Sequence, residues 1–262
     1  MLFFDLDGTL LDSNGIWLDI DAAFLGEHGI APVPEDYTEY VTHHSPLDAA
    51  RYTRTRFHLS ETAEEIRQAW LRMAKAAYAG QLELKPGARA LLERCRRRGW
   101  RMAVLTSCMP ELCRAALEHH GIADWFQGVV TTQETGLEKR DPALYRQAAA
   151  RWGVPPEDCV LFEDSPGYCA AAGEAGFYVA GVRDPLYAGR EEELRRLCGS
   201  WVDSLEQLPP ELEARLFEPF SHGRTAGTRE GLVGLGLAIT RDIVEAHGGV
   251  IRYARNPGGG AI

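Results

Sequence analysis

Short runs of apolar residues recur along the chain up to residue 182, and helical patterns separate the later ones. Continuous apolar runs that alternate with helices predict a buried parallel sheet, because the connecting helices cover both of its faces. The predicted strands are residues 2–6, 102–105, 128–131, 159–162 and 177–182. The clearest helices between them are residues 142–152 and 167–175. The pattern therefore predicts an α/β fold that binds its ligand beyond the carboxyl ends of the strands.

Residues 14–84 interrupt this alternation and are predicted to be nearly all helical. Thr62 and Glu65 have the spacing of a capping box, and apolar residues at helical spacing follow them. Another helix is predicted to open at Pro86-Gly87 and to close at Gly99. An insert of helices between the first two strands predicts a helical cap on a sheet domain. The predicted domains are residues 1–13 with 85–208 (core), 14–84 (cap) and 209–262 (a separate tail).

The composition is that of an ordinary globular protein, with 45% hydrophobic and 25% charged residues among 262. The formal net charge of −10 argues against nucleic acid or an anionic membrane as the main partner. No apolar stretch reaches the roughly 18 residues of a membrane span. The charged residue Asp5 lies close to the N-terminus, where a signal peptide would have its apolar stretch, so we expect no signal peptide. The six cysteines form no Cys-x-x-Cys pair, which predicts reduced, buried thiols and a cytoplasmic location.

Two aspartates end the first predicted strand. Side chains alternate along a strand, so Asp5 and Asp7 point to the same side. Gly8 permits a tight turn directly after them. Two carboxylates beside exposed backbone N–H groups suit a divalent metal ion and a phosphate group, although many Asp-x-Asp-Gly sequences are plain turns.

Three further polar groups follow later strands. Thr106 and Ser107 can hold a phosphate oxygen, or Thr106 can cap the next helix. Lys139 is a compact cation suited to phosphate, or an ordinary loop lysine. Glu163 and Asp164 can bind a metal ion, or serve as a helix cap. Each of these sites is ambiguous when taken alone. Together with Asp5 and Asp7 they make four sites in sequence order, each at the end of a predicted strand, and this arrangement favours a catalytic centre.

The run from Asp5 to Ser13 resembles motif I of the haloacid dehalogenase superfamily of phosphohydrolases. Residues 136–142 resemble its Lys-x-x-Pro motif III, with Arg140 where many relatives have proline. Residues 163–165 resemble motif IV. The resemblance covers about residues 1–208 and implies a Rossmann-like parallel sheet. Its helical insert is similar to the cap of the subgroup that contains phosphoglycolate phosphatase and beta-phosphoglucomutase.

This resemblance implies a mechanism. Asp5 is the expected nucleophile, which forms an aspartyl phosphate, and Asp7 the expected general acid and base. Thr106 and Lys139 are expected to position the transferring group. The resemblance implies Mg²⁺, held by the carboxylate of Asp5, the backbone carbonyl of Asp7 and Asp164, with Glu163 assisting. The residues expected to bind substrate are Gly8, Thr9, Ser107, His43 and His44.

The cap is expected to select the substrate. Asn14, Trp17 and residues 42–46 are its candidates for facing the site. His43 and His44 are either substrate contacts or features of a loop.

The tail carries a second resemblance, to the end of a sensor histidine kinase ATPase domain. Residues 216–220 resemble its F box and residues 234–239 its glycine loop, where Leu232 and Val233 depart from the usual Gly and Thr. The N box and the Asp-x-Gly-x-Gly adenine site have no counterpart upstream, so we expect no useful ATP binding. The tail is predicted to be an α+β fragment, with an unrelated glycine-rich segment as the alternative.

These observations predict a Mg²⁺-dependent phosphatase that acts on a small phosphorylated metabolite. A sugar phosphomutase of the same family is the alternative, because Asp5 and Asp7 would serve it equally. Two alternatives come from other classes of protein. One is a nucleotide-binding or kinase-partner module that acts through the tail, and the other is an interaction protein without catalytic activity. The sequence leaves the substrate and the oligomeric state open.

Overall fold

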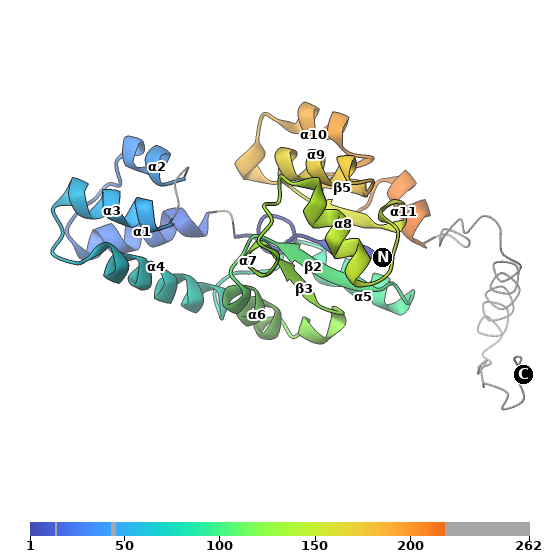
Figure 1. The fold of residues 1–262 in the computed structure, drawn as a ribbon, viewed down its shortest axis with the longest axis horizontal. Helices are drawn as coiled ribbons and strands as arrows, with labels where there is room; N and C mark the ends of the chain where they lie inside the picture. The colour runs from blue at the N-terminus through green and yellow to red at the C-terminus, as the bar shows by residue number, and fades with distance from the viewer. Residues whose placement is uncertain (14, 43–45, 218–262) are drawn as a thin grey trace, which may run out of the picture. The chain divides into compact units, whose positions relative to one another are not determined.

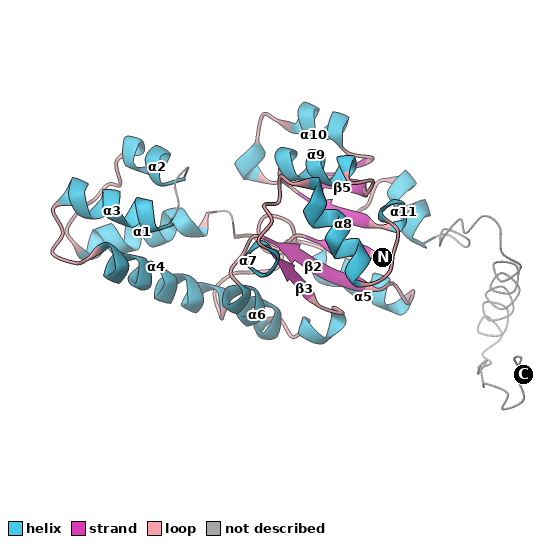
Figure 2. Ribbon diagram, in the orientation of Figure 1, coloured by secondary structure: helices cyan, strands magenta, loops and turns pink. Residues whose placement is uncertain are grey.

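The computed structural model describes residues 1–13, 15–42 and 46–217 (Figure 1). Contacts divide the chain into one unit of Met1–Glu213 and another of Ala214–Ile262. The first unit contains a six-stranded sheet in the order β3-β2-β1-β4-β5-β6. Figure 2 shows strands of this sheet in magenta, with helices around them. The strands are β1 Leu2–Phe4, β2 Met102–Thr106, β3 Val129–Thr131, β4 Val160–Glu163, β5 Tyr178–Val182 and β6 Ser200–Val202. All neighbouring strands are parallel, which confirms the predicted α/β fold.

The first strand lies at the centre of the sheet because its side chains are apolar on both faces. Phe3 packs on one face against Phe177, with ring centroids 5.3 Å apart. Phe4 stacks on the other face against Phe162 at 4.7 Å. Both side chains are fully buried, and each contributes about 1.5–3 kcal/mol relative to an exposed position. The strand is therefore a fixed support for the residues that follow it.

Helices connect the strands and cover the sheet. The helices of the core are α5 Ala88–Arg97, α6 Pro110–His119, α7 Thr132–Thr135, α8 Pro142–Arg151, α9 Pro166–Glu174, α10 Glu191–Leu197 and α11 Pro210–Phe217. Three short 3₁₀ turns are η1 Ala123–Trp125, η2 Pro156–Asp158 and η3 Pro185–Tyr187. Buried residues of α8, α9 and α10 share one cluster with Phe3. The buried residues of α5 and α6 lie outside that cluster.

Strand β6 was not predicted. It has three residues, Ser200-Trp201-Val202, and its pairing with β5 rather than its own pattern makes it a strand. The five predicted strands are present, with bounds that differ by one or two residues. None of the helices in the described part of the chain is long and apolar enough to cross a membrane.

The insert between β1 and β2 is helical, as predicted. Its helices are α1 Ile16–Glu27, α2 Glu35–Thr42, α3 Pro46–Phe57 and α4 Ala63–Tyr78. The predicted capping box starts α4, because Thr62 Oγ1 accepts the Glu65 N–H and the Glu65 carboxylate accepts the Thr62 N–H. The buried face of α4 consists of Ile66, Trp70, Ala74, Ala77 and Tyr78. Trp70 packs edge-on against Phe24 of α1, with centroids 5.9 Å apart.

Two linkers join the cap to the core, and backbone hydrogen bonds tie them together. The Asp12 N–H donates to the Glu83 carbonyl at 3.0 Å, and the Lys85 N–H to the Leu10 carbonyl at 2.8 Å. Gly87 then turns into α5 with φ of 82°. A Cβ there would lie 2.2 Å from the Glu206 nitrogen, so only glycine fits.

A buried carboxyl group lies inside the cap. Asp21 of α1 is 9% exposed, and the Tyr37 hydroxyl donates to its Oδ1 at 3.2 Å. That hydroxyl also lies 3.0 Å from Thr53 Oγ1. Burial raises the pKa of Asp21 to about 6, and the hydrogen bond from Tyr37 lowers it only in part. The folded cap therefore favours the neutral acid.

Asp21→Asn should therefore stabilise the protein relative to wild type as pH rises. The pKa of Asp21 is raised on folding, so its favourable contribution is complete below about pH 4, the unfolded value, and is lost as pH passes about 6. Asparagine keeps the uncharged shape at every pH. Urea unfolding between pH 4 and 7.5 would measure the difference, with Asp19→Asn on the exposed side of α1 as the control. If the free energies of unfolding of Asp21→Asn and wild type change with pH in the same way, the raised pKa of Asp21 is contradicted.

Helix α11 bears on where the core ends. Leu212 is fully buried, and the Glu213 carboxylate pairs with the Arg94 guanidinium of α5. Both residues lie beyond residue 208, where the sequence places the end of the core. The boundary at 209 stays a prediction, and these contacts favour a core that includes the start of α11.

A chain that ends at residue 208 should be less stable than one that ends at 217. Loss of the buried Leu212 side chain alone costs about 2 kcal/mol. Thermal melts of both chains and of the full chain would measure this. Equal melting temperatures for the two shortened chains would place the boundary at 209, as the sequence suggests.

Candidate active site

The strand register brings the predicted site residues to one edge of the sheet. Phe4 of β1 pairs with Val104 of β2 and with Phe162 of β4. Asp5 therefore lies at the carboxyl end of the central strand, level with Leu105 and Glu163. The chain leaves β1 and β4 at the point where the strand order reverses, and open parallel sheets bind their ligands there.

Lys139 is the centre of the charge arrangement. Its ammonium group lies 2.8 Å from Asp5 Oδ1 and 2.6 Å from Glu163 Oε2, and its side chain is 1% exposed. Burial by itself would lower the pKa of Lys139, but the charges of Asp5 and Glu163 raise it well above its usual value. The ring of Tyr168 adds a cation–π contact at 4.5 Å. The reading of Lys139 as an ordinary loop lysine is therefore wrong.

Helix α8 fixes the backbone at Lys139. The Tyr145 hydroxyl donates to the Lys139 carbonyl at 2.8 Å. Asp141 caps the helix by accepting the Ala143 N–H at 2.8 Å, and Pro142 is the first helical residue. Arg140, where many relatives have proline, is exposed and leaves this geometry intact.

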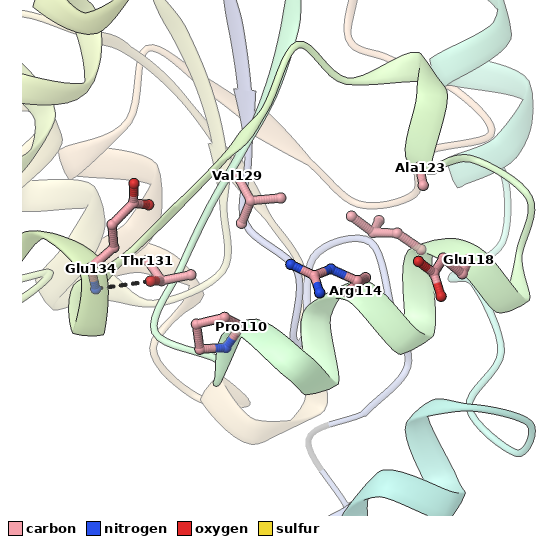
Figure 3. Close-up of a pocket in the computed structure, with 8 residues that line it drawn as sticks. Pro110, Arg114, Glu118, Ala123, Val129, Thr131 and Glu134 are labelled. Atoms are coloured by element: carbon pink, nitrogen blue, oxygen red, sulfur yellow. Dashed lines mark hydrogen bonds between the residues drawn. The ribbon is translucent and has the colours of Figure 1, made fainter.

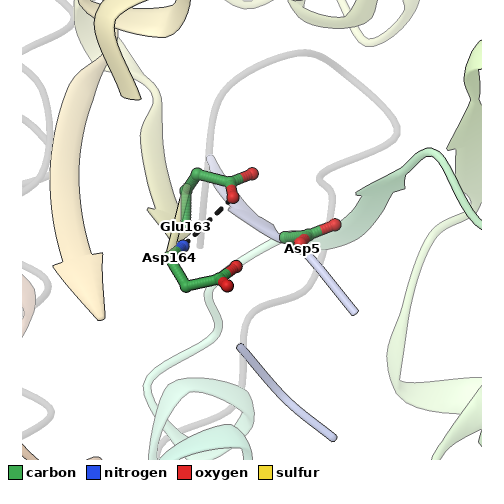
Figure 4. A group of neighbouring side chains, drawn as sticks. All are labelled: Asp5, Glu163 and Asp164. Atoms are coloured by element: carbon green, nitrogen blue, oxygen red, sulfur yellow. Dashed lines mark hydrogen bonds between the residues drawn. The ribbon is translucent and has the colours of Figure 1, made fainter. Parts of the chain in front are cut away.

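Three buried carboxylates form a cluster beside Lys139. Oxygens of Asp5, Glu163 and Asp164 lie within 4.8 Å of one another (Figure 4). Burial raises the pKa of Asp164 well above its usual value, and the charges of Glu163 and Asp5 raise it further. Carboxylates held this close repel one another, and a divalent cation with oxygen ligands relieves that repulsion. The donor set fits such a cation.

The three carboxylates are not equivalent. Glu163 Oε1 accepts the N–H groups of Asp164 and Ser165 at 3.1 and 2.9 Å, and its Oε2 accepts from Lys139. Thr9 Oγ1 donates to Asp164 Oδ1 at 3.2 Å. Glu163 is thus engaged at both oxygens by the protein, which leaves Asp5 and Asp164 better placed to offer oxygens to a cation.

Asp7 is half-buried and contacts the cap. Its Oδ1 accepts hydrogen bonds from Ser13 Oγ and from the Tyr78 hydroxyl, both at 2.6 Å. Burial raises the pKa of Asp7, and the two hydrogen bonds lower it in part. Ser13 belongs to the motif I run, whereas Tyr78 is the last residue of α4.

The turn after Asp7 is held from the far linker. Gly8 has φ of 78°, a value that favours glycine. The Lys85 ammonium group donates to the Gly8 carbonyl at 2.5 Å, to the Arg183 carbonyl at 2.8 Å and to Asp184 Oδ2 at 2.6 Å. Asp184 is 3% exposed, so this is a largely buried ion pair.

Thr106 is the last residue of β2, whereas the sequence places it directly after the strand, and its side chain is 1% exposed. Its Oγ1 accepts the Cys108 N–H at 3.0 Å, which leaves the hydroxyl hydrogen for another acceptor. Ser107, the next residue, is exposed.

The structure joins Asp5, Lys139, Glu163 and Asp164 by direct contacts and brings Thr9 onto Asp164. Asn14, His43 and His44 lie outside the described residues. Trp17 of α1 is 44% exposed. The contacts that sequence analysis missed come from Ser13, Tyr78, Lys85, Tyr168 and Asp184. Of these, only Ser13 carried a signal, as part of motif I.

A separate hollow of about 550 Å³ lies beside β3 (Figure 3). Its lining comes from α6, η1, β3 and α7 and includes Arg114, Glu118 and Glu134. All three charged side chains are exposed, and none of the carboxylates described above lines the hollow. The hollow is therefore separate from the cluster around Lys139.

Comparison with known proteins agrees with this geometry. The family described as haloacid dehalogenase-like hydrolase matches residues 1–176. A phosphoglycolate phosphatase of Cereibacter sphaeroides is 31% identical over 193 residues, which cover 70% of this chain and 83% of the relative. A phosphoserine phosphatase of Thermus thermophilus is 37% identical, but the match covers only 40% of this chain and 41% of that relative. The crystal structure of a putative beta-phosphoglucomutase from Thermotoga maritima has a TM-score of 0.69 at 23% identity and covers 78% of this chain and 94% of that one.

The chain belongs to the haloacid dehalogenase-like hydrolases. It is an enzyme of the phosphatase and phosphomutase type within them. A second family, the histidine kinase-, DNA gyrase B- and HSP90-like ATPases, matches residues 188–262. The match begins before β6, which pairs with β5 and so belongs to the sheet. It agrees with the resemblance of the tail to a sensor histidine kinase ATPase domain and extends it to earlier residues.

Proposed function

We propose that the protein is a Mg²⁺-dependent phosphatase that hydrolyses a small phosphorylated metabolite through an aspartyl phosphate. The observation that carries the proposal is the buried Lys139 between Asp5 and Glu163, next to Asp164. A buried cation and an acidic cluster on one strand edge suit a phosphoryl group and its counter-ion together.

Asp5 is the nucleophile in this proposal. One of its carboxylate oxygens attacks phosphorus while the bond to the leaving oxygen breaks. Lys139 holds Oδ1 at 2.8 Å, which fixes the carboxylate in one orientation and leaves Oδ2 for the attack. The same ammonium group offsets negative charge that develops on the transferring group.

The cofactor is proposed to be Mg²⁺, held by Asp5, Asp164 and the backbone carbonyl of Asp7. Magnesium retains several waters and takes few protein carboxylates, which suits this donor set. When bound, it supplies positive charge that reduces repulsion between an anionic substrate and Asp5. Glu163 supports the site by holding Lys139 and the backbone N–H groups of Asp164 and Ser165.

Asp7 is proposed as the general acid for the leaving oxygen and then as the base for the attacking water. Its raised pKa, which follows from burial, favours the protonated form that the first step requires. Thr106 and Ser107 with Gly8 and Thr9 are proposed to hold the phosphate oxygens. Thr106 has a hydroxyl hydrogen free for that purpose.

The proposed substrate class is supported by the relatives, whose names include phosphoglycolate and phosphoserine phosphatases. A cytoplasmic location is part of the proposal and is supported by six cysteines that are all unpaired. The proposed phosphatase releases inorganic phosphate, whereas a mutase returns it to a sugar phosphate. Measuring free phosphate and product isomers in one assay separates these two activities.

Asp5→Asn should reduce phosphate release by about a thousandfold or more, which corresponds to roughly 4 kcal/mol in the barrier. The amide keeps the shape of the side chain but is a poor nucleophile. A panel of metabolite phosphates with Mg²⁺ and with a chelator would measure it, and circular dichroism would confirm the fold. A loss of only about tenfold would rule out covalent catalysis by Asp5.

Asp164→Ala should weaken Mg²⁺ binding by about tenfold or more, because a hard cation loses an oxygen ligand. Calorimetric titration of the free enzyme with Mg²⁺ reads this without any substrate. Asp124→Ala, in the exposed turn η1, is the matched control and should bind Mg²⁺ as wild type does. Identical titrations for Asp164→Ala and wild type would remove Asp164 from the metal site.

A further inference from the structure

The cap contributes one polar group directly to the catalytic loop. Tyr78 is the last residue of α4 and is 1% exposed. Its hydroxyl donates to Asp7 Oδ1 at 2.6 Å, across 71 positions of sequence. The Cys108 thiol also lies beside the Asp7 carboxyl group, but a thiol is a weak donor.

The two strong donors go to the same oxygen. Ser13 Oγ also donates to Asp7 Oδ1 at 2.6 Å, and its side chain is 2% exposed. A carboxylate oxygen has two lone pairs, so Oδ1 is fully used by these hydroxyl groups. Among the described residues, no hydroxyl, amide or ammonium group donates to Oδ2. The proton of the neutral acid therefore belongs on Oδ2.

We propose that Tyr78 is a positioning residue that, together with Ser13, aims Asp7 Oδ2 at the leaving-group oxygen. The proposal rests on the proposed phosphatase function and adds a residue of the cap to its proton-transfer step. Two short hydrogen bonds from different directions stop rotation of the carboxyl group. Only one orientation then remains, with the acidic oxygen away from Ser13 and Tyr78.

The step balances without any further reactant. As Asp5 forms its bond to phosphorus, the bond between phosphorus and the leaving oxygen breaks, and that oxygen keeps the electron pair. The proton on Asp7 Oδ2 moves to the same oxygen, which leaves as a neutral hydroxyl compound. The Asp7 carboxylate that results, still held by Tyr78 and Ser13, then takes a proton from the water that opens the aspartyl phosphate.

A purely structural role for Tyr78 predicts a different result. A buried hydroxyl needs an acceptor, and Asp7 could simply satisfy it. Removing the hydroxyl would then lower kcat/KM for all substrates by the same factor. A positioning role makes the loss depend on how much the leaving group needs a proton.

The test compares Tyr78→Phe with wild type on phenyl phosphate and 4-nitrophenyl phosphate, which have almost the same shape. Phenol is about as weak an acid as tyrosine, with a pKa of about 10, and its departure gains from a proton. Nitrophenol is a much stronger acid and leaves without one. The kcat/KM value is the right readout, because it reports only the steps up to departure of the leaving group.

We expect Tyr78→Phe to lower kcat/KM for phenyl phosphate by about tenfold or more, and for 4-nitrophenyl phosphate by less than about threefold. Ser13→Ala should show the same selectivity, and it tests the proposal if Tyr78→Phe does not fold. Tyr37→Phe is the matched control, since it removes a buried cap hydroxyl that bonds Asp21 and Thr53. It should change both substrates equally or not at all.

Equal losses on the two substrates in Tyr78→Phe and Ser13→Ala, or no loss in either, would overturn the positioning role. In that case an active wild type and an inactive Asp5→Asn would leave the proposed phosphatase standing. A folded wild type that hydrolyses neither aryl phosphate nor any member of the metabolite panel would overturn both.

Discussion

The ion pair of Lys139 with Asp5 and Glu163 is the contact on which the rest of the site depends. Taking an ammonium group and carboxylates out of water is costly, and removing one partner of such a pair costs about 3–5 kcal/mol, because a charge is left buried alone. The fold therefore has to bring three separate segments together: the end of β1, the loop before α8 and the end of β4. The order of the strands does this, since β1 and β4 are neighbours. The same ion pairs that join these three segments also orient the carboxylate of Asp5, the proposed nucleophile.

The parallel sheet separates the proposed catalytic residues from the interior of the cap. Every strand ends at the same edge, so the carboxylates and Lys139 are held by rigid elements with apolar supports such as Phe3 and Phe4. The cap has its own apolar interior around Phe24 and Trp70, and it connects to the core through two linkers. The apolar interior of the cap is therefore separate from the strand ends, and Tyr78 is the cap residue whose hydroxyl reaches Asp7.

Most of the sheet and of the catalytic edge could be predicted from the sequence, because short apolar runs carry the strand signal and motif residues follow them directly. Strand β6 could not, since three residues show no periodicity and their pairing with β5 decides the structure. Lys139 was identified by its motif, but nothing in the sequence showed that it is fully buried. Tyr78 and Lys85 gave no signal, because each acts through a contact with a residue more than 70 positions away. The local sequence pattern predicts whether a segment is a helix or a strand. It does not predict which distant atom a side chain contacts.

Residues 78–85, which return the chain from cap to core, have a consequence for how such proteins can be recombined. Tyr78 reaches Asp7 at one end of this segment, and Lys85 reaches the Gly8 carbonyl at the other. The segment is a linker by topology, yet it supplies two of the groups that hold Asp7 and Gly8 in place. A chimaera that borrows a foreign cap should therefore be joined within α4, ahead of Tyr78, so that the recipient keeps its own return segment. A join after the last residue of α4 would replace Tyr78 together with the cap and remove its hydrogen bond to Asp7.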